Sequence, residues 1–305
     1  MRSLPKPTLR LPAFAKINTC LYILGRRPDG YHELRTIFQT ISLHDTLEFS
    51  MIRRAAVELE CDDPTLPSGR QNLVWSAATT MRKRLGLRAG VHIRLEKRIP
   101  VERGLGGGSS DAAVALLGVM KLARRTLPTE ELLEMAAALG SDVPFFLVGG
   151  RALGVGRGQE IYPLPETPRL TLLVVSPKDV AVSTRKAYGW VTSRLTKQRM
   201  ESTLKRFCAL CWNQQGGPLH NDFEGAVFKR HPRLARIKRA LFLHGAAEVA
   251  LAGSGSAVFA IFPSPAKARR AAQQFPNDQV FVVKTLSRDE YRRALAPPLG
   301  RGIGR

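Results

Sequence analysis

Residues 104–113, GLGGGSSDAA, carry the strongest local signal in this chain. Six of its first seven positions are four glycines and two serines, and helix-forming sequence follows at once. Glycine loses more conformational freedom on folding than any other residue, so a stable fold keeps it where a side chain would block a backbone conformation or a close approach. A cluster of this density indicates a loop whose backbone has a specific task.

The sequence on both sides indicates the kind of loop. Residues 91–97, VHIRLEK, alternate apolar and polar side chains, which predicts a strand, and residues 111–125 are rich in alanine and leucine, which predicts a helix. The first turn of a helix leaves backbone N–H groups unpaired, and the helix dipole adds partial positive charge there. The combination predicts a phosphate-binding site, to which Ser109 and Ser110 add hydroxyl donors.

Three common phosphate-binding patterns do not fit this loop. A P-loop requires a lysine after the glycines, and none is present. Ser109 stands where a dinucleotide-binding fingerprint has its third glycine, and the H-R-D and D-F-G motifs of protein kinases are missing. The alternative to a phosphate site is a glycine loop that only lets a helix pack closely.

Four stretches together resemble one known family. Residues 100–113, PVERGLGGGSSDAA, resemble the ATP-binding motif of the GHMP kinase superfamily, which includes galactokinase, homoserine kinase and mevalonate kinase. Residues 15–41, AKINTCLYILGRRPDGYHELRTIFQTI, and 140–147, GSDVPFFL, resemble signatures of its 4-diphosphocytidyl-2-C-methyl-D-erythritol kinase family. LAGSGSAVFA, 251–260, resembles that family's C-terminal glycine motif, and the likeness runs from about residue 12 to 285.

The resemblance implies a reaction and the residues that carry it. The reaction is ATP-dependent phosphorylation of the 2-hydroxyl of a cytidine-diphosphate sugar alcohol, 4-diphosphocytidyl-2-C-methyl-D-erythritol, in the non-mevalonate route to isoprenoid precursors, with Mg²⁺ beside ATP. Glu102 and Arg103 stand where the family often has small residues. The implied residues are the catalytic pair Lys16 and Asp142; the ATP-binding residues Pro100, Val101, Glu102, Arg103, Gly104, Leu105, Gly106, Gly107, Gly108, Ser109, Ser110, Asn72 and Lys97; and the substrate-binding residues Asn18, Tyr31, His32 and Tyr188.

The residues support this chemistry independently of the family. The alternating pattern of residues 14–24 places Lys16 and Asn18 on the same face of a predicted strand. Phosphoryl transfer requires positioning, charge stabilisation and a base for the attacking hydroxyl, and a lysine and Asp142 could supply the last two. Without the glycine loop, the simpler interpretation would be a solvated strand lysine and a loop carboxylate. For Tyr31 and His32 the simpler interpretation is a surface turn.

The element pattern predicts an α+β fold of two domains. By the resemblance, the first is a ribosomal-protein-S5-like α/β domain and the second a ferredoxin-like α/β sandwich. A proline-rich stretch, YPLPETP, at residues 162–168 indicates the boundary. We therefore expect an ATP-binding domain over residues 1–165, a second GHMP kinase domain over 166–290, and a flexible basic tail over 291–305.

Composition limits the remaining alternatives. The 305 residues carry a net charge of +22, but the basic residues occur as scattered pairs, which predicts a solvated surface and small anionic ligands rather than a specific nucleic-acid or membrane partner. Four scattered cysteines and no apolar leader predict a cytoplasmic protein. Another GHMP kinase, acting on mevalonate or homoserine, is disfavoured by RRPDGYHEL (residues 26–34), because those substrates carry no base. A nucleic-acid-binding protein would need one clustered basic face.

Overall fold

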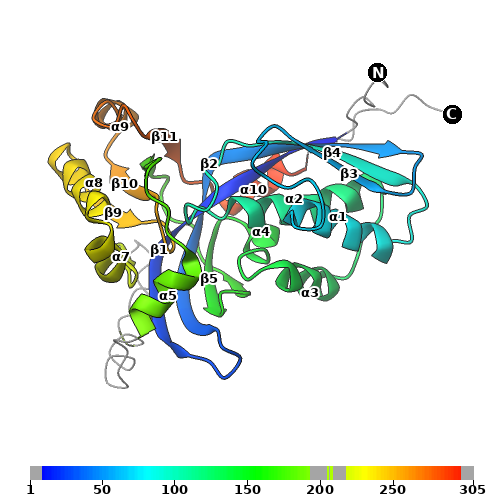
Figure 1. Cartoon of the computed structure of the whole chain (residues 1–305), viewed down its shortest axis with the longest axis horizontal. Helices are drawn as coiled ribbons and strands as arrows, with labels where there is room; N and C mark the ends of the chain where they lie inside the picture. The colour runs from blue at the N-terminus through cyan, green and yellow to red at the C-terminus, as the bar shows by residue number, and fades with distance from the viewer. Residues whose placement is uncertain (1–8, 193–204, 206, 209–217, 297–305) are drawn as a thin grey trace.

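The computed structural model describes residues 9–192, 205, 207–208 and 218–296. Within these residues the chain forms two β-sheets that lie side by side, each with helices packed against it (Figure 1). None of the described helices combines the length and the apolar character that crossing a bilayer requires.

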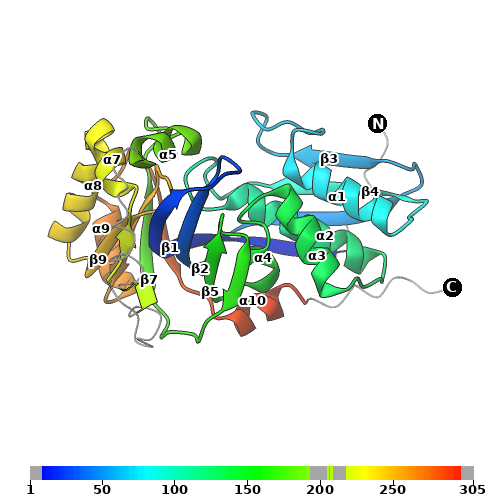
Figure 2. The same ribbon diagram turned by 90° about the horizontal axis from the view of Figure 1, so that it is seen from below.

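The first sheet is built around one long antiparallel hairpin, in which β1 (Leu9–Arg26) pairs with β2 (His32–Ile52). One edge of β2 pairs with two different strands along its length (Figure 2). The strand order is β3-β4-β2-β1-β8, and β5 pairs with β2 and β6. The remaining strands are β3 (Val57–Cys61), β4 (Gly90–Glu96), β5 (Arg151–Gly156), β6 (Glu160–Pro163) and β8 (His220–Asn221).

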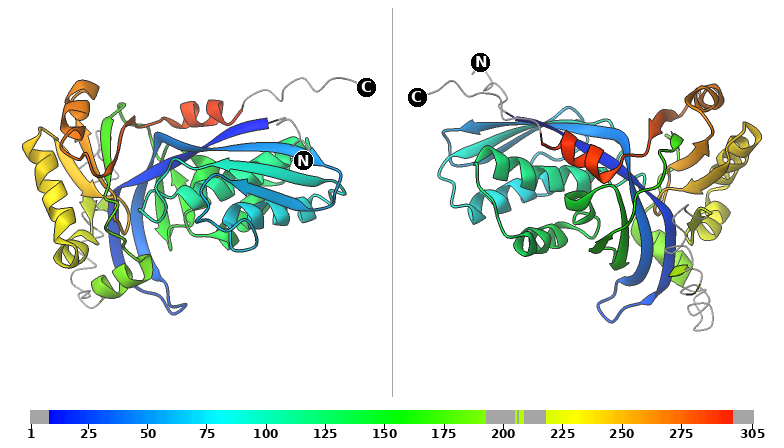
Figure 3. Two further views of the ribbon diagram at one scale, coloured as in Figure 1. Left: turned by 45° about the horizontal axis from the view of Figure 1, so that its top comes forward. Right: turned by 180° about the vertical axis from the view of Figure 1, so that it is seen from behind.

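Helices pack on one side of this sheet, where the apolar side chains of β2 and β4 form a core with them (Figure 3). The predicted helix that opens at the glycine loop is present as α2, and Gly118 lets it approach β2 closely, because a Cβ there would stand 2.3 Å from Phe49 Cζ. The helices are α1 (Leu73–Arg84), α2 (Gly107–Leu122), α3 (Thr129–Leu139) and α4 (Phe145–Val148).

The second sheet has the order β11-β7-β10-β9, and all its pairs are antiparallel. The chain order, strand, helices, two strands, helix, strand, is that of a ferredoxin-like sandwich, which confirms the predicted class. Its elements are β7 (Thr171–Ser176), α5 (Thr184–Thr192), α7 (Glu224–Arg230), α8 (Pro232–Leu243), β9 (Glu248–Leu251), β10 (Val258–Phe262), α9 (Pro265–Ala272) and β11 (Gln279–Lys284).

The molecule has two halves, one around the first sheet and one around the second. The side chains of β7, which alternate between its two faces, join them. Leu173 and Val175 pack with the helices of the second half, whereas Leu172 and Val174 pack against Ile17 and other residues of the first sheet. Successive side chains of a strand point to opposite faces, so a strand buried on both faces is apolar at every position. The two halves therefore share an apolar interface.

The chain crosses between the halves more often than predicted. β8 belongs to the second half in sequence but pairs in parallel with β1 of the first sheet. The prediction of a flexible tail from residue 291 is wrong for the part of it that the structure describes, because α10 (Arg288–Ala294) lies beside β1 (Figure 3). Tyr291 is fully buried there and its hydroxyl donates to the Phe146 carbonyl. A capping box starts this helix, with the Ser287 hydroxyl accepting from the Glu290 N–H.

Candidate active site

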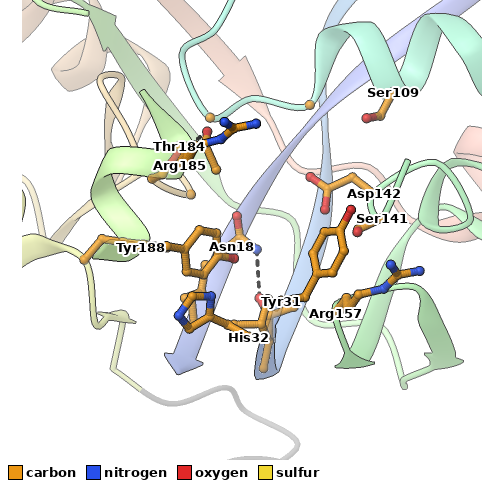
Figure 4. A pocket seen from close by; sticks show the side chains of 18 of the residues that line it. Asn18, Tyr31, His32, Ser109, Ser141, Asp142, Arg157, Thr184, Arg185 and Tyr188 are labelled. Carbon is orange, nitrogen blue, oxygen red and sulfur yellow. Dashed lines mark hydrogen bonds between the residues drawn. The ribbon is translucent and has the colours of Figure 1, made fainter. Parts of the chain in front are cut away.

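A cavity of about 940 Å³ opens where the two halves meet. The β1–β2 hairpin, the glycine loop, the turn before α4, helix α5 and the turn after β9 all contribute to its walls (Figure 4). Nine residues predicted from the sequence line it: Lys16, Asn18, Tyr31, His32, Gly104, Gly106, Ser109, Asp142 and Tyr188.

Two glycines give the loop its shape. Gly104 has φ +78°, and a Cβ there would stand 1.9 Å from the Ala252 carbonyl oxygen. Gly106 has φ +73° and is the N-cap of α2. Any other residue would be strained in this left-handed region, and at Gly104 it would also collide with backbone. The Lys16 N–H donates to the Leu105 carbonyl at 2.9 Å and so fixes the loop against β1.

Lys16 lines the cavity, although only 4% of its surface is exposed. Its ammonium Nζ donates to Asn18 Oδ1 at 2.8 Å and lies 3.3 Å from Asp142 Oδ2. Asn18 Nδ2 donates in turn to Thr36 Oγ1 at 2.7 Å. The strand pattern predicted that Lys16 and Asn18 share a face, and the structure confirms it. A buried ammonium needs such partners, because an uncompensated charge there would be costly.

Asp142 is held in place by the turn between α3 and α4. Gly140 ends α3, and the Val143 N–H donates to its carbonyl at 3.1 Å. Val143 and Phe145 are fully buried, so the turn is anchored in the core while the Asp142 side chain stays one-third exposed, at 33%, toward the cavity. The carboxylate can therefore reach Lys16 and a bound molecule at once.

Aromatic side chains form the other end of the cavity. The His32 ring stacks on the Tyr188 ring, with centroids 4.5 Å apart and planes inclined by 15° (Figure 4). Tyr31 is half-exposed, and the Arg157 guanidinium lies over its ring, 4.5 Å from the centroid. Burial, and to a lesser degree Arg26, lowers the pKa of His32. A neutral imidazole can donate from one ring nitrogen and accept at the other.

The structure places Lys97 and Asn72 outside the cavity walls. Lys97 Nζ pairs with Asp45 and lies 2.8 Å from Asp111 Oδ2, under the first turn of α2. Burial and the neighbouring Asp45 raise the pKa of Asp111 to about 8, despite the opposing effect of Lys97. Asn72 is the N-cap of α1, and its side chain accepts from the Val74 N–H at 2.9 Å.

The other residues of the predicted ATP loop differ in their surroundings. Val101, Glu102 and Gly108 are exposed, whereas the side chains of Pro100, Leu105 and Ser110 are buried. The buried Ser110 hydroxyl has no hydrogen-bond partner among the described residues, whereas Ser109 lines the cavity. Gly107 would place a Cβ 3.0 Å from Ile99 Cγ2. Arg103 turns toward the second half of the chain.

Comparison with known proteins gives the same picture as the geometry. The family model of the GHMP kinases N terminal domain matches residues 72–150, and that of the GHMP kinases C terminal matches residues 198–280. The chain is 43% identical, over 92% of its own length and 90% of the relative's, to the 4-diphosphocytidyl-2-C-methyl-D-erythritol kinase of Solibacter usitatus. The chain belongs to the 4-diphosphocytidyl-2-C-methyl-D-erythritol kinase family.

Solved structures agree with this assignment. A crystal structure of 4-(cytidine 5'-diphospho)-2C-methyl-D-erythritol kinase superposes with a TM-score of 0.75 at 34% identity, covering 91% of this chain and 99% of that one. Homoserine kinase from Cytophaga hutchinsonii gives a TM-score of 0.69 at 18% identity, covering 94% and 97% of the two chains, which shows a shared fold. The chain is thus a kinase of the GHMP superfamily.

Ser141, Arg157, Thr184 and Arg185 are among the cavity-lining residues that sequence reasoning missed. Ser141 precedes Asp142 in the same turn, and its place in GSDVPFFL was a usable signal. Arg157, Thr184 and Arg185 come from β-turn and helix segments with no motif of their own, so only the folded chain brings them to the site.

Proposed function

We propose that this kinase transfers the γ-phosphoryl group of ATP to the 2-hydroxyl of 4-diphosphocytidyl-2-C-methyl-D-erythritol, forming the 2-phosphate and ADP in the non-mevalonate route to isoprenoid precursors. The observation that carries the proposal is one cavity with the glycine loop and the Lys16–Asp142 pair at one end and the stacked His32 and Tyr188 rings at the other. This arrangement suits an acceptor that carries both a hydroxyl and a base.

The ATP phosphates would bind at the start of α2. The N–H groups of its first turn have no partner within the helix, and the helix dipole favours negative charge at this end. Gly108 has no side chain to stand in the way of a phosphate oxygen that approaches the backbone, and the Ser109 hydroxyl faces the cavity. The nucleotide-binding domain would then be the first half of the molecule, which consists of residues 9–165 together with α10.

Asp142 would accept the proton of the 2-hydroxyl as its oxygen attacks the γ-phosphorus. The bond to the bridging oxygen of ADP breaks, and its electron pair leaves with ADP. Lys16 lies 3.3 Å from the Asp142 carboxylate, so its ammonium can stabilise the negative charge on the attacking oxygen and on the phosphoryl group. The buried Asn18 keeps this ammonium in position through its hydrogen bond.

The aromatic end would hold the cytosine. A base can stack on the Tyr188 ring, and such stacking tolerates any base. Discrimination therefore requires hydrogen bonds to the base edge, and the neutral His32 imidazole is the side chain placed to make them. Tyr31, on the facing side of the cavity, would close over the base or the ribose (Figure 4).

Magnesium would enter with ATP. Mg²⁺ is usually held by one or two protein oxygens plus substrate phosphates rather than by a full protein cage. The described residues fit this mode, because they contain no cluster of three acidic, histidine or cysteine ligands, while the Ser109 hydroxyl and the Asp142 carboxylate both face the cavity. Bound there, the ion would neutralise charge on the phosphates.

A substrate panel tests the proposal. Release of ADP is followed by a coupled assay with ATP and, in parallel, 4-diphosphocytidyl-2-C-methyl-D-erythritol, mevalonate and homoserine. We expect turnover with the cytidine substrate and a kcat/KM at least about a hundredfold lower with the other two, because they leave the base-edge hydrogen-bonding groups unpaired. Equal turnover of mevalonate or homoserine would assign the chain to another GHMP activity.

A further inference from the structure

Arg103 belongs to the glycine loop, but its side chain reaches the second half of the molecule. Its guanidinium Nη1 donates to the Val180 carbonyl and to Ser256 Oγ, the latter at 2.7 Å. Its own carbonyl accepts from the Ala257 N–H at 3.2 Å. Both the backbone and the side chain of this residue therefore tie the loop to the ferredoxin-like sandwich.

The segment that Arg103 holds leads directly into α5. Val180 is 7% exposed and belongs to the apolar core under α5, which also contains Ala187. Helix α5 carries Arg185 and Tyr188 into the cavity. A rigid helix transmits a displacement at its start to the side chains one turn later. A shift of the glycine loop that moves the Val180 carbonyl would therefore also move the Tyr188 side chain.

We propose that Arg103 is a positioning residue that couples nucleotide binding at the glycine loop to the placement of α5, the helix that faces the acceptor substrate. The inference rests on the proposed function for the identity of the two ligands. It assigns Arg103 a role other than holding phosphate, since its charged end donates to the 178–183 segment and to Ser256.

The hydrogen-bond pattern shows that Arg103 can be removed without leaving a buried acceptor unpaired. The Ser256 hydroxyl also donates to the Val180 carbonyl, at 2.6 Å, so that carbonyl keeps a partner in an Arg103 variant. A second link, between Thr184 Oγ1 and Ser254 Oγ at 2.9 Å, still fastens the start of α5. We therefore expect Arg103 variants to fold, because the large costs of substitution come mainly from unpaired buried groups and cavities.

A lysine variant distinguishes the effect of the positive charge of Arg103 from the effect of its hydrogen bonds to the second half of the molecule. Arg103→Lys keeps the positive charge, but a single ammonium cannot reproduce the planar guanidinium, whose Nη1 donates to Val180 and Ser256 while its Nη2 reaches the Lys178 carbonyl at 3.5 Å. Arg103→Ala removes both the positive charge and the hydrogen bonds. If Arg103 acts as a link, the two variants should behave alike, whereas a phosphate-binding role would leave the lysine variant close to wild type.

Hydrogen–deuterium exchange measures the coupling without using the acceptor. Exchange is compared with and without a non-hydrolysable β,γ-imido analogue of ATP in the wild type, Arg103→Ala, Arg103→Lys and the control Arg88→Ala, which removes an exposed charge away from the cavity. In the wild type and the control, the analogue should slow exchange in residues 100–110 and, about fivefold or more, in residues 178–189. In both Arg103 variants only residues 100–110 should be protected.

The outcomes separate this inference from the proposed function. Protection of residues 100–110 without protection of 178–189 in the wild type would overturn the coupling alone, as would equal protection of 178–189 in Arg103→Ala. A lysine variant that behaves like wild type would also overturn it. No protection of residues 100–110 in the wild type would instead remove the nucleotide site, and the proposed function with it.

Discussion

Asp142 is the side chain on which the proposed reaction depends most directly. If it accepts the hydroxyl proton, Asp142→Asn should lower kcat by about 10²- to 10⁴-fold, since this is the range that a positioned base contributes. The measurement is steady-state kinetics on a folded variant. Glu134→Gln, an isosteric change at an exposed position of α3, serves as the control and should leave kcat unchanged. Near-normal turnover of Asp142→Asn would refute the assignment.

Tyr188 tests the base-binding end of the cavity. Loss of one stacking ring costs about 1–3 kcal/mol, so Tyr188→Ala should raise the KM for the cytidine substrate roughly 5- to 150-fold and affect kcat less. Tyr188→Phe keeps the ring and should retain a KM close to that of the wild type. Unaltered KM in the alanine variant would place the base elsewhere.

His32 tests discrimination separately from stacking. We expect His32→Ala to narrow the ratio of kcat/KM between the cytidine substrate and its uridine counterpart, because the edge of the base loses its hydrogen-bonding partner. Both kcat/KM values are measured in the wild type and the variant. An unchanged ratio would show that another side chain recognises the base edge.

The start of helix α2 allows stability and ligand binding to be separated. Gly108 is exposed, has an ordinary φ, and would have only Leu73 Cδ1 near a new Cβ, at 3.9 Å. Gly108→Ala should therefore raise the free energy of unfolding by about 0.4–1 kcal/mol through the more restricted unfolded chain, while it weakens binding of an ATP analogue. Thermal unfolding and calorimetry provide the two measurements.

Gly106→Ala is the contrasting variant, because its φ of +73° and the nearby Phe146 ring disfavour any side chain. It should lose stability as well as affinity. If Gly108→Ala binds the analogue as tightly as the wild type does, the first turn of α2 is not the phosphate site.

A buried charge cluster joins helix α2 to β2 and the end of β4 and makes stability depend on pH. Asp111 has a pKa of about 8 in the folded chain, because burial and Asp45 raise it, and a usual value near 3.8 when unfolded. The folded state thus binds a proton that the unfolded state has lost. The contribution of this group to stability is complete below about pH 4 and is lost as the pH rises to about 8.

Urea unfolding at several pH values tests this linkage. Relative to Asp111→Asn, whose amide does not titrate, the unfolding free energy of the wild type should fall between about pH 5 and 8, by at most about 1.4 kcal/mol per pH unit. Parallel curves for the two proteins would mean that Lys97 keeps Asp111 ionised throughout this range.

At the scale of the whole molecule, basic residues are exposed on two of the helices that cover the second sheet. Arg236 and Arg239 of α8 and Lys267 and Arg270 of α9 are exposed on the helical layer of the second sheet (Figure 1). With a net charge of +22, we expect any DNA or RNA binding to be independent of sequence and to weaken steeply with salt. Anisotropy titrations with unrelated duplexes measure this, and tight sequence-dependent binding at physiological salt would contradict it.

Local signals were enough to predict much of the site. The glycine loop, the common face of Lys16 and Asn18, and the turn before Tyr31 depend on residues close in sequence, whose conformations follow from backbone freedom, strand alternation and turn chemistry. Their roles in binding and catalysis stay predictions. The S-x-x-E signal at Ser287 was equally local and would have predicted α10.

Other features were decided by the tertiary structure alone. Lys97 is neutralised by Asp45, which lies 52 residues away, and Arg103 donates to a carbonyl 77 residues away. The stack of His32 on Tyr188 and the pairing of β8 with β1 likewise join distant segments. Such partners depend on how the two sheets pack, because charge compensation and hydrogen bonding act over a few ångströms in space regardless of separation along the chain.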